Sequence, residues 1–285
     1  MPRPSVPASM LALLAGGLLS GCGTSPSTTA TTDDRPNFVL VMADDMGWSD
    51  IGCYGGEIRT PNLDALAANG LRLTQFYNTA RCCPTRASLL TGRYPHQAGV
   101  GHMVYDAGFE SYRGELDRGS ATMAEALGDA GYATAMSGKW HVTHNLGEPR
   151  KRIEPAERTN WPVDRGFDWF YGTIHGAGSF FDPVTLARGN DYIERDREDF
   201  HYTDRINEEA AAFISGHAAS GDDRPFLLYV AHTAPHWPLH AREADIEACA
   251  GRYDAGWDAL RLERLERQDR KSTRLNSSHT VISYA

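Results

Sequence analysis

Short apolar runs separated by helix-like segments dominate the middle of the chain. Residues 37–43 and 226–231 are continuous apolar runs, and residues 71–77 and 132–137 have the composition of further strands. A continuous apolar run, rather than an alternating one, is typical of a strand buried on both faces of a mainly parallel sheet. We expect this environment for residues 37–43.

Helices are predicted between these strands. Residues 61–70 carry a proline near the start and a glycine at the end, residues 121–131 and 204–215 each precede a strand, and residues 260–268 form a charged helical segment. Alternation of helices and strands predicts an α/β fold, with a doubly wound, mainly parallel sheet that has helices on both faces.

The first 22 residues are predicted to be a lipoprotein signal peptide. Arg3 provides a weak basic region, a short apolar stretch begins at Met10, and residues 19–22 (Leu-Ser-Gly-Cys) resemble a bacterial lipobox. The apolar stretch is shorter than the roughly 20 residues that a membrane-spanning helix needs. We expect a lipid anchor on Cys22, a flexible tether over residues 23–35 and a location in the periplasm or cell envelope; an uncleaved membrane anchor is the alternative.

The end of the chain differs from the rest in composition. Residues 269–285 resemble the translation of a sequencing-library adapter and are predicted to be a non-native tail, with a disordered polar tail as the alternative. The folded domain is therefore expected over residues 36–268.

Composition and charge exclude some classes of protein. The chain has 285 residues, and its 41% hydrophobic content is ordinary for one large α/β domain or two smaller ones. The formal net charge of −9 argues against nucleic acid as a partner. Five cysteines are present, and they are not expected to form a disulfide framework.

The most informative segment runs from Arg81 to Arg93. Cys82 stands one turn ahead of Arg86, and Pro84 between them is at the predicted first position of a helix. A cysteine in this place lies in the partial positive charge of a helix N-terminus, which activates a nucleophile and holds an anion. On spacing alone, a capped core helix with a buried thiol explains the segment equally well.

Two adjacent carboxylates follow the first predicted strand. Asp44 and Asp45 lie at its carboxyl end, which is the edge where ligands bind in open α/β sheets. They repel each other unless a cation joins them, and hard oxygen ligands suit Ca²⁺ or Mg²⁺. A helix cap or a plain turn is the alternative.

Another predicted strand, over residues 132–137, leads to Lys139 and His141. Residues two apart in an extended segment share a face, so both side chains are expected in one cleft while Trp140 packs away from it. A lysine offers a point charge for an anion, and a histidine moves a proton near neutral pH. An isolated Lys-x-His is commonplace and by itself indicates no function.

Three histidines follow the strand over residues 226–231 at intervals of four. On a helix His232, His236 and His240 would form a metal-binding face. Pro235 and Pro238 exclude a regular helix there, so the segment is not predicted to be a zinc site.

These segments together resemble the type I sulfatases. Residues 82–86, with Cys82, Pro84 and Arg86, followed by Leu-Thr-Gly-Arg at residues 90–93, look like the first signature of that family. The Gly-Lys-Trp-His run at residues 138–141 resembles the second signature. The resemblance covers roughly residues 35–268, and it implies an alkaline-phosphatase-like fold and hydrolysis of a sulfate ester to an alcohol or phenol plus sulfate.

In this family the signature cysteine is oxidised to Cα-formylglycine, whose hydrate is the nucleophile. The resemblance assigns this role to Cys82, with Cys83 as a spacer, and it implies that Arg86 stabilises the ionised nucleophile while Lys139 binds sulfate. A hydrated aldehyde provides one hydroxyl for attack and a second whose deprotonation expels sulfate.

Two histidines and a metal complete the implied site. His141 takes the proton from the remaining hydroxyl, and His236, in a loop that resembles the family loop over residues 233–239, protonates the leaving oxygen. Asp44, Asp45 and Cys82 are the implied ligands of Ca²⁺. The implied partners are a small-molecule or glycan sulfate ester and a formylglycine-generating maturation enzyme, with membrane contact through the lipid anchor only.

One departure from the family pattern lies downstream. Type I sulfatases complete the metal site with an Asp-Asn pair and the sulfate site with a second lysine, but this chain has no Asp-Asn dipeptide. We therefore expect residues 36–268 to be an incomplete N-terminal catalytic domain, nearly inactive as written. Two alternatives are a phosphoric or phosphonic ester hydrolase on the same scaffold and a non-catalytic, lipid-anchored anion- or glycan-binding protein.

Overall fold

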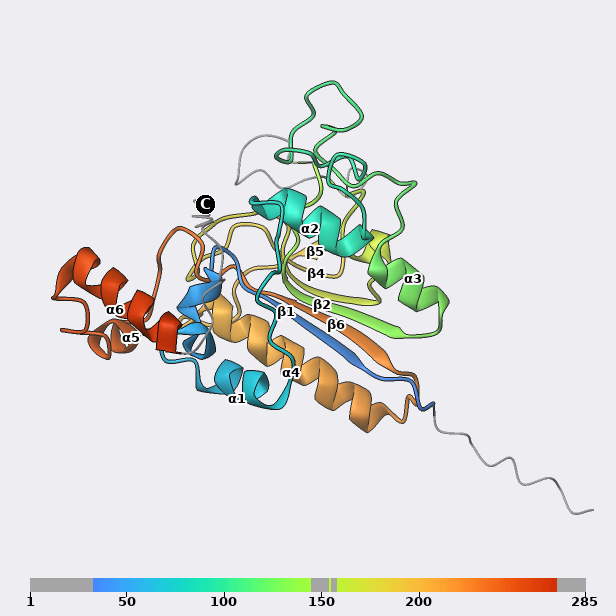
Figure 1. Ribbon diagram of the computed structural model, residues 1–285. Helices are drawn as coiled ribbons and strands as arrows, with labels where there is room; N and C mark the ends of the chain where they lie inside the picture. Colours follow the sequence, from blue (N-terminus) through green and yellow to red (C-terminus); the bar gives the residue numbers. More distant parts are fainter. Residues whose placement is uncertain (1–32, 145–153, 155–157, 271–285) are drawn as a thin grey trace, which may run out of the picture. The chain divides into compact units, whose positions relative to one another are not determined.

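The computed structural model describes residues 33–144, 154 and 158–270 (Figure 1). Six strands form one sheet in the order β1-β6-β2-β3-β4-β5. Neighbouring strands from β1 to β3 are parallel, and β4 and β5 are added antiparallel. The strands are β1 (Phe38–Met42), β2 (Ala133–Lys139), β3 (Trp169–Thr173), β4 (Leu186–Arg188), β5 (Asp191–Tyr192) and β6 (Phe226–Ala231).

Helices cover both faces of the sheet. In Figure 1, α2 and α3 lie on one side of β2 and β6, and α4 lies on the other. The helices are α1 (Pro61–Asn69), α2 (Cys82–Thr91), α3 (Met123–Asp129), α4 (Tyr202–Ser220), α5 (Glu243–Glu247) and α6 (Gly256–Arg270), with short 3-10 helices at Trp48–Asp50, Gly52–Tyr54 and Val163–Arg165.

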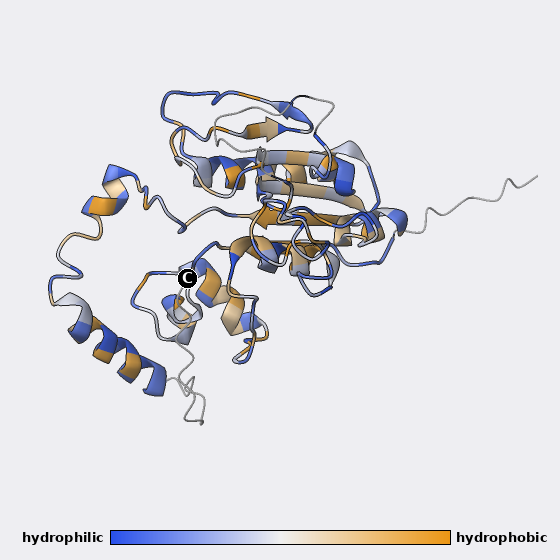
Figure 2. Ribbon diagram, turned by 90° about the horizontal axis from the view of Figure 1, so that it is seen from above, coloured by the Kyte–Doolittle hydropathy of each residue, from blue (hydrophilic) through white to orange (hydrophobic). Residues whose placement is uncertain are grey.

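Alternation along the central strands separates two apolar cores. Leu227 and Tyr229 belong to the core that includes Ala87 and Leu90 of α2, whereas Leu228 and Val230 belong to the core that includes residues of α4. Successive side chains of a strand point to opposite faces, so β6 contributes to both cores. Figure 2 shows the hydrophobic residues gathered in the sheet. The predicted doubly wound, mainly parallel fold is confirmed.

Two strand predictions are wrong. The run over residues 37–43 does contain β1, but this strand is not buried on both faces, because Val39 is 52% exposed and Val41 is 57% exposed. The strand order places β1 at the edge of the sheet, where it pairs with β6 alone among the described strands. Residues 71–77 form no strand and pair with none of the described strands, and Leu71 is 86% exposed.

Helix boundaries also differ from the prediction. Helix α2 begins at Cys82, so Pro84 is its third residue rather than its first; its missing N–H is still one of those without an intrahelical acceptor. Helix α3 begins later than predicted because Thr122 and Glu125 form a capping box.

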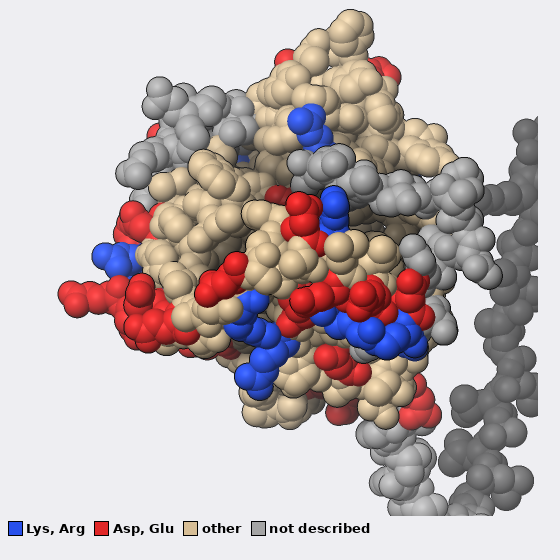
Figure 3. Space-filling view, turned by 60° about the vertical axis from the view of Figure 1, so that its left-hand side comes forward, with Lys and Arg blue, Asp and Glu red and all other residues tan. Residues whose placement is uncertain are grey.

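The charged C-terminal segment forms α6, which extends to Arg270 and thus two residues into the predicted tail. Arg264 pairs with Asp50 and Glu57, and Arg267 pairs with Glu57, so ion pairs attach this helix to the loop after β1. On the face shown in Figure 3, acidic and basic side chains lie next to one another.

The structure does not test the predicted signal peptide or most of the predicted tail. The signal peptide, Cys22 and residues 271–285 lie outside the described residues. Within the described residues, no helix has both the length and the apolar character needed to span a membrane.

Candidate active site

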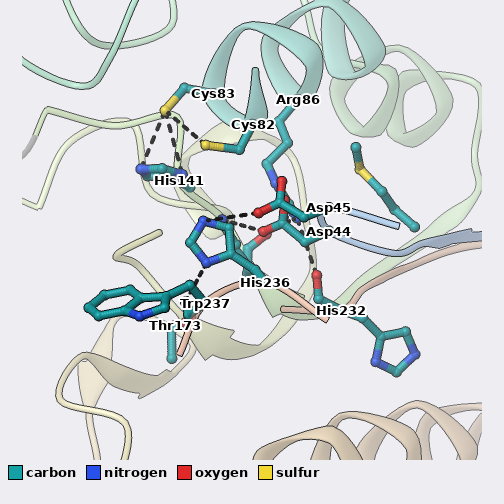
Figure 4. A network of polar contacts seen from close by, with 12 residues as sticks. Asp44, Asp45, Cys82, Cys83, Arg86, His141, Thr173, His232, His236 and Trp237 are labelled. Atoms are coloured by element: carbon teal, nitrogen blue, oxygen red, sulfur yellow. Dashed lines mark hydrogen bonds and ion pairs between the residues drawn. The ribbon is translucent and has the colours of Figure 1, made fainter. Parts of the chain in front are cut away.

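The candidate site lies where the parallel strands end. Asp44 and Asp45 follow β1, Lys139 is the last residue of β2, and His232 follows β6. Because these strands are parallel neighbours, their carboxyl ends meet at one edge of the sheet. The first turn of α2 lies above this edge, and Figure 4 shows the side chains that converge there.

The two cysteines of α2 have different environments. Cys82 is half-buried, whereas Cys83 is fully buried, and their Sγ atoms are 3.9 Å apart. A hydrogen bond from the Cys83 thiol, together with His141 and the positive charge of Lys139, lowers the pKa of Cys82. The same hydrogen bond and burial raise the pKa of Cys83. Within the pair, Cys82 is therefore the thiol that ionises more readily.

A buried cluster of charges lies beneath the cysteines. Lys139 Nζ donates a hydrogen bond to Asp44 Oδ2, and the Arg86 guanidinium lies 3.4 Å from the same oxygen. All three residues are buried, and burial together with the charge of Arg86 lowers the pKa of Lys139. Asp44 thus compensates two cations where water is excluded.

Arg86 also connects the ends of two strands. Its Nη1 donates to the carbonyl oxygen of Lys139 at 2.7 Å, and its Nη2 donates to that of His232 at 3.2 Å. Among the hydrogen bonds of the described residues, none joins Arg86 to Cys82. The predicted action of Arg86 on Cys82 is consequently electrostatic at most, and the side chain also holds β2 and β6 in place beneath α2.

His141 and Lys139 both face this site, as predicted. Trp140 points away, with its Nε1 donating to the carbonyl oxygen of Asn160 at 2.8 Å. Because β2 ends at Lys139, strand alternation does not extend to His141; its positive φ of 57° sets the ring direction instead. Burial lowers the pKa of His141 to about 4.

Three of the four non-glycine residues with a positive φ in the described part of the chain lie in loops that adjoin β1, β2 or α2. Asp45 has a φ of 63°, Ala80 has 58° and His141 has 57°, all in the left-handed region that non-glycine residues rarely adopt. Residues held in such conformations cost about 1 to 3 kcal/mol each and cluster at functional sites. The loops after β1 and β2 therefore position Asp45 and His141 in backbone conformations that lower the stability of the fold.

Of the three histidines at positions 232, 236 and 240, it is His236 whose side chain contacts a carboxylate of the site. His236 Nε2 lies 3.6 Å from Asp45 Oδ2, and His236 Nδ1 contacts the carbonyl oxygen of Trp237. The His232 side chain is largely buried, with no hydrogen-bond partner for its Nδ1 among the described residues, and burial lowers its pKa. His240 accepts a hydrogen bond from the backbone of Phe180. The segment is not helical, as its prolines predicted.

Cys83 contacts His141, which the spacing of the residues in the sequence did not indicate. Cys83 was expected to be a spacer, yet its Sγ lies 3.3 Å from His141 Nε2 and 3.5 Å from Nδ1. The two residues are 58 positions apart in the sequence, so no local pattern reports this contact.

The predicted metal ligands were Asp44, Asp45 and Cys82. Both carboxylates lie at the site, and their hard oxygen atoms fit Ca²⁺, although one oxygen of Asp44 already binds Lys139. Two carboxylates supply only part of the 6 to 8 oxygen atoms that Ca²⁺ takes.

Comparison with known proteins identifies what this arrangement resembles. The Sulfatase family model matches residues 36–283. An arylsulfatase of Klebsiella aerogenes is 34% identical over 280 residues, covering 94% of this chain and 55% of that protein. The chain therefore spans about half the length of this curated relative.

Solved structures with a similar fold were also found. The crystal structure of Ps i-CgsB in complex with k-i-k-neocarrahexaose has a TM-score of 0.64 and 26% identity, and the match covers 83% of this chain and 53% of that one. A structure in complex with its substrate D-glucosamine-2-N,6-O-disulfate has a TM-score of 0.57 and 27% identity, covering 75% of this chain and 37% of that one.

Proposed function

Since the chain belongs to the sulfatase family, we propose that it is part of a sulfuric ester hydrolase of the arylsulfatase type, which cleaves a sulfate ester to an alcohol or phenol plus sulfate. One observation carries the proposal. Cys82, whose pKa is lowered, lies at the first turn of α2 beside a buried lysine and a buried histidine. This is an electropositive position for a nucleophile that attacks an anionic ester.

We assign Cys82 as the residue that a formylglycine-generating maturation enzyme converts. When present, the formylglycine hydrate supplies a hydroxyl nucleophile together with a second hydroxyl for release of sulfate. Lys139 provides a positive charge at the end of β2, where it attracts a sulfuryl oxygen, and Arg86 adds a second buried charge.

We assign opposite roles to the two histidines. His141 is buried and its pKa is about 4, so its imidazole is neutral at physiological pH and accepts a proton. His236 lies beside Asp45, and we assign it as the donor to the leaving oxygen. Asp44 and Asp45 would hold Ca²⁺, which polarises sulfuryl oxygens when bound.

The relatives support the proposed substrate class. One solved neighbour is bound to D-glucosamine-2-N,6-O-disulfate and another to a neocarrahexaose, while a curated relative is an arylsulfatase. We therefore include glycan sulfate esters with small-molecule sulfate esters as substrates.

A lipid anchor at Cys22 remains our proposal for the N-terminus. The Leu-Ser-Gly-Cys sequence at residues 19–22 and the Ser- and Thr-rich sequence that follows support it. With such an anchor we expect the enzyme in the periplasm or cell envelope, where it would meet sulfate esters from outside the cell.

The test uses the natural full-length protein, produced together with a formylglycine-generating enzyme. We expect calcium-dependent turnover of an aryl sulfate that exceeds turnover of the matching aryl phosphate, and a peptide mass at Cys82 that corresponds to formylglycine. Faster turnover of the phosphate would favour the phosphoric ester hydrolase. An unmodified Cys82 and no turnover, with retained binding of sulfated glycans, would favour a binding protein.

A further inference from the structure

Four soft donor atoms lie together at the first turn of α2. The donor atoms of Cys82, Cys83 and His141 all lie within 4.8 Å of one another. Met103 adds a thioether, with its Sδ atom 3.8 Å from Cys83 Sγ. Figure 4 shows both sulfur atoms of the cysteine pair turned toward the His141 ring.

The distances from Cys83 Sγ to Cys82 Sγ and to His141 are close to those between ligands of one tetrahedral metal ion. Zinc binds sulfur at about 2.3 Å and nitrogen at about 2.0 to 2.1 Å, which places two ligand sulfurs about 3.8 Å apart and a sulfur and a nitrogen about 3.6 Å apart. The two Sγ atoms are 3.9 Å apart, and Cys83 Sγ lies 3.3 Å from Nε2 of His141, the one ring nitrogen that we assign as a ligand.

From this geometry we propose that the unconverted protein binds a thiophilic d¹⁰ cation, represented by Zn²⁺, through Cys82, Cys83 and His141. Binding releases the thiol protons and leaves the fourth position to water or to Met103. The site requires both cysteines as thiols, so it belongs to the protein before maturation. The proposal does not rest on sulfate ester hydrolysis.

The donor set separates this site from the carboxylates below it. Thiolates and imidazole select Zn²⁺ and Cu⁺, whereas carboxylates select Ca²⁺ and Mg²⁺. Asp44 is already paired with Lys139 and Arg86, and it lies outside the cluster formed by the cysteines and His141. A bound soft cation would occupy Cys82 and protect its thiol from oxidation and from conversion.

The experiment uses the full chain produced without a maturation enzyme, with an unmodified Cys82 verified by mass spectrometry. Co²⁺ is the spectroscopic probe, because cobalt bound to thiolates shows charge-transfer absorption in the near ultraviolet. We expect the band to saturate at one equivalent, to disappear when Zn²⁺ is added, and to persist in excess Ca²⁺. Absence of the band, or its loss in Ca²⁺, would overturn the proposal.

Substitutions then locate the site. Cys82→Ser and His141→Asn should each weaken Zn²⁺ binding by about tenfold or more, since changes even behind the ligands cost 10- to 100-fold. Cys53→Ser and Cys249→Ser, at two other half-buried free cysteines, should leave affinity unchanged. Equal losses of Zn²⁺ affinity in the ligand variants and in the control variants would overturn the proposal. Cys83→Ser would test the third ligand, but it changes a buried residue and can prevent folding. Cys82 is only half-buried, so Cys82→Ser tests the site even in that case.

Discussion

The backbone of Gly176 packs against the imidazole of His141. A β-carbon on Gly176 would lie 2.0 Å from Cε1 of His141, 2.2 Å from Nε2 and 2.3 Å from Nδ1, so no larger residue fits without moving the ring. His141 is itself held in a left-handed backbone conformation. The glycine and the backbone turn together determine where the imidazole points.

We expect Gly176→Ala in the matured full-length enzyme to lower kcat/KM by about 100-fold, because a displacement of about 1 Å in a catalytic group can cost this much. Steady-state kinetics with an aryl sulfate measure the effect. Gly178→Ala is the matched control in the same loop, since a β-carbon there meets no atom within 4 Å. Equal rates for the two variants would show that the position of His141 does not limit turnover.

Replacement of either cysteine distinguishes the nucleophile from its neighbour. In the same enzyme, Cys82→Ala should reduce turnover by about a thousandfold or more, as loss of a nucleophile does. Cys83→Ala should retain most of the activity and lose about 1 kcal/mol of stability, because it removes a fully buried side chain. Comparable loss of activity from both changes would contradict the assignment of Cys82.

Asp44 compensates two buried cations, so its loss should destabilise the fold. In the present chain, Asp44→Asn should lower the free energy of unfolding by about 3 kcal/mol, because Lys139 and Arg86 would remain buried without a carboxylate. Urea denaturation measures this change. Asp45→Asn is the control, since Asp45 is partly exposed and asparagine tolerates its left-handed backbone. A loss below about 1 kcal/mol for Asp44→Asn would contradict the importance of the buried pair.

The lowered pKa of His141 predicts a specific pH dependence of stability. Its pKa is about 4 in the folded chain against an ordinary value of 6.5, so between these values the unfolded state binds a proton that the folded state does not. The contribution of His141 therefore makes stability rise with pH across this window, by about 3 kcal/mol in total, and leaves it constant above pH 6.5.

His141→Asn should remove this contribution while it keeps a residue that accepts the positive φ. Urea denaturation of both proteins at pH values from 4 to 7 gives the difference directly. Parallel stability curves for the two proteins would show that His141 is not the group that titrates.

The lipid anchor gives a prediction for the segment before the folded domain. Cys22→Ser should yield an unlipidated or unprocessed protein, because a serine cannot form the thioether to the lipid. Detergent partitioning and intact mass after expression in a bacterium with lipoprotein processing measure the outcome. Unchanged partitioning, with the mass of a lipidated protein, would count against the lipobox.

Local sequence patterns determined the class of fold, and the resemblance to the sulfatase signatures determined most of the candidate site. Apolar runs and helix signals predicted the alternating α/β order, since these depend on neighbouring residues. The signatures around Cys82 and Lys139 identified residues that the structure brings to one sheet edge. The prolines after His232 correctly excluded a helical metal face.

The tertiary structure alone decided strand order and contacts across the chain. The runs that contain β1 and β6 look alike in sequence, yet β6 is central and buried while β1 is an exposed edge, because burial depends on which strands lie alongside. The contact of Cys83 with His141, and the pairing of Asp44 with Arg86, join residues that are far apart in the chain. Such contacts depend on how helices pack on the sheet, which a one-dimensional pattern does not encode.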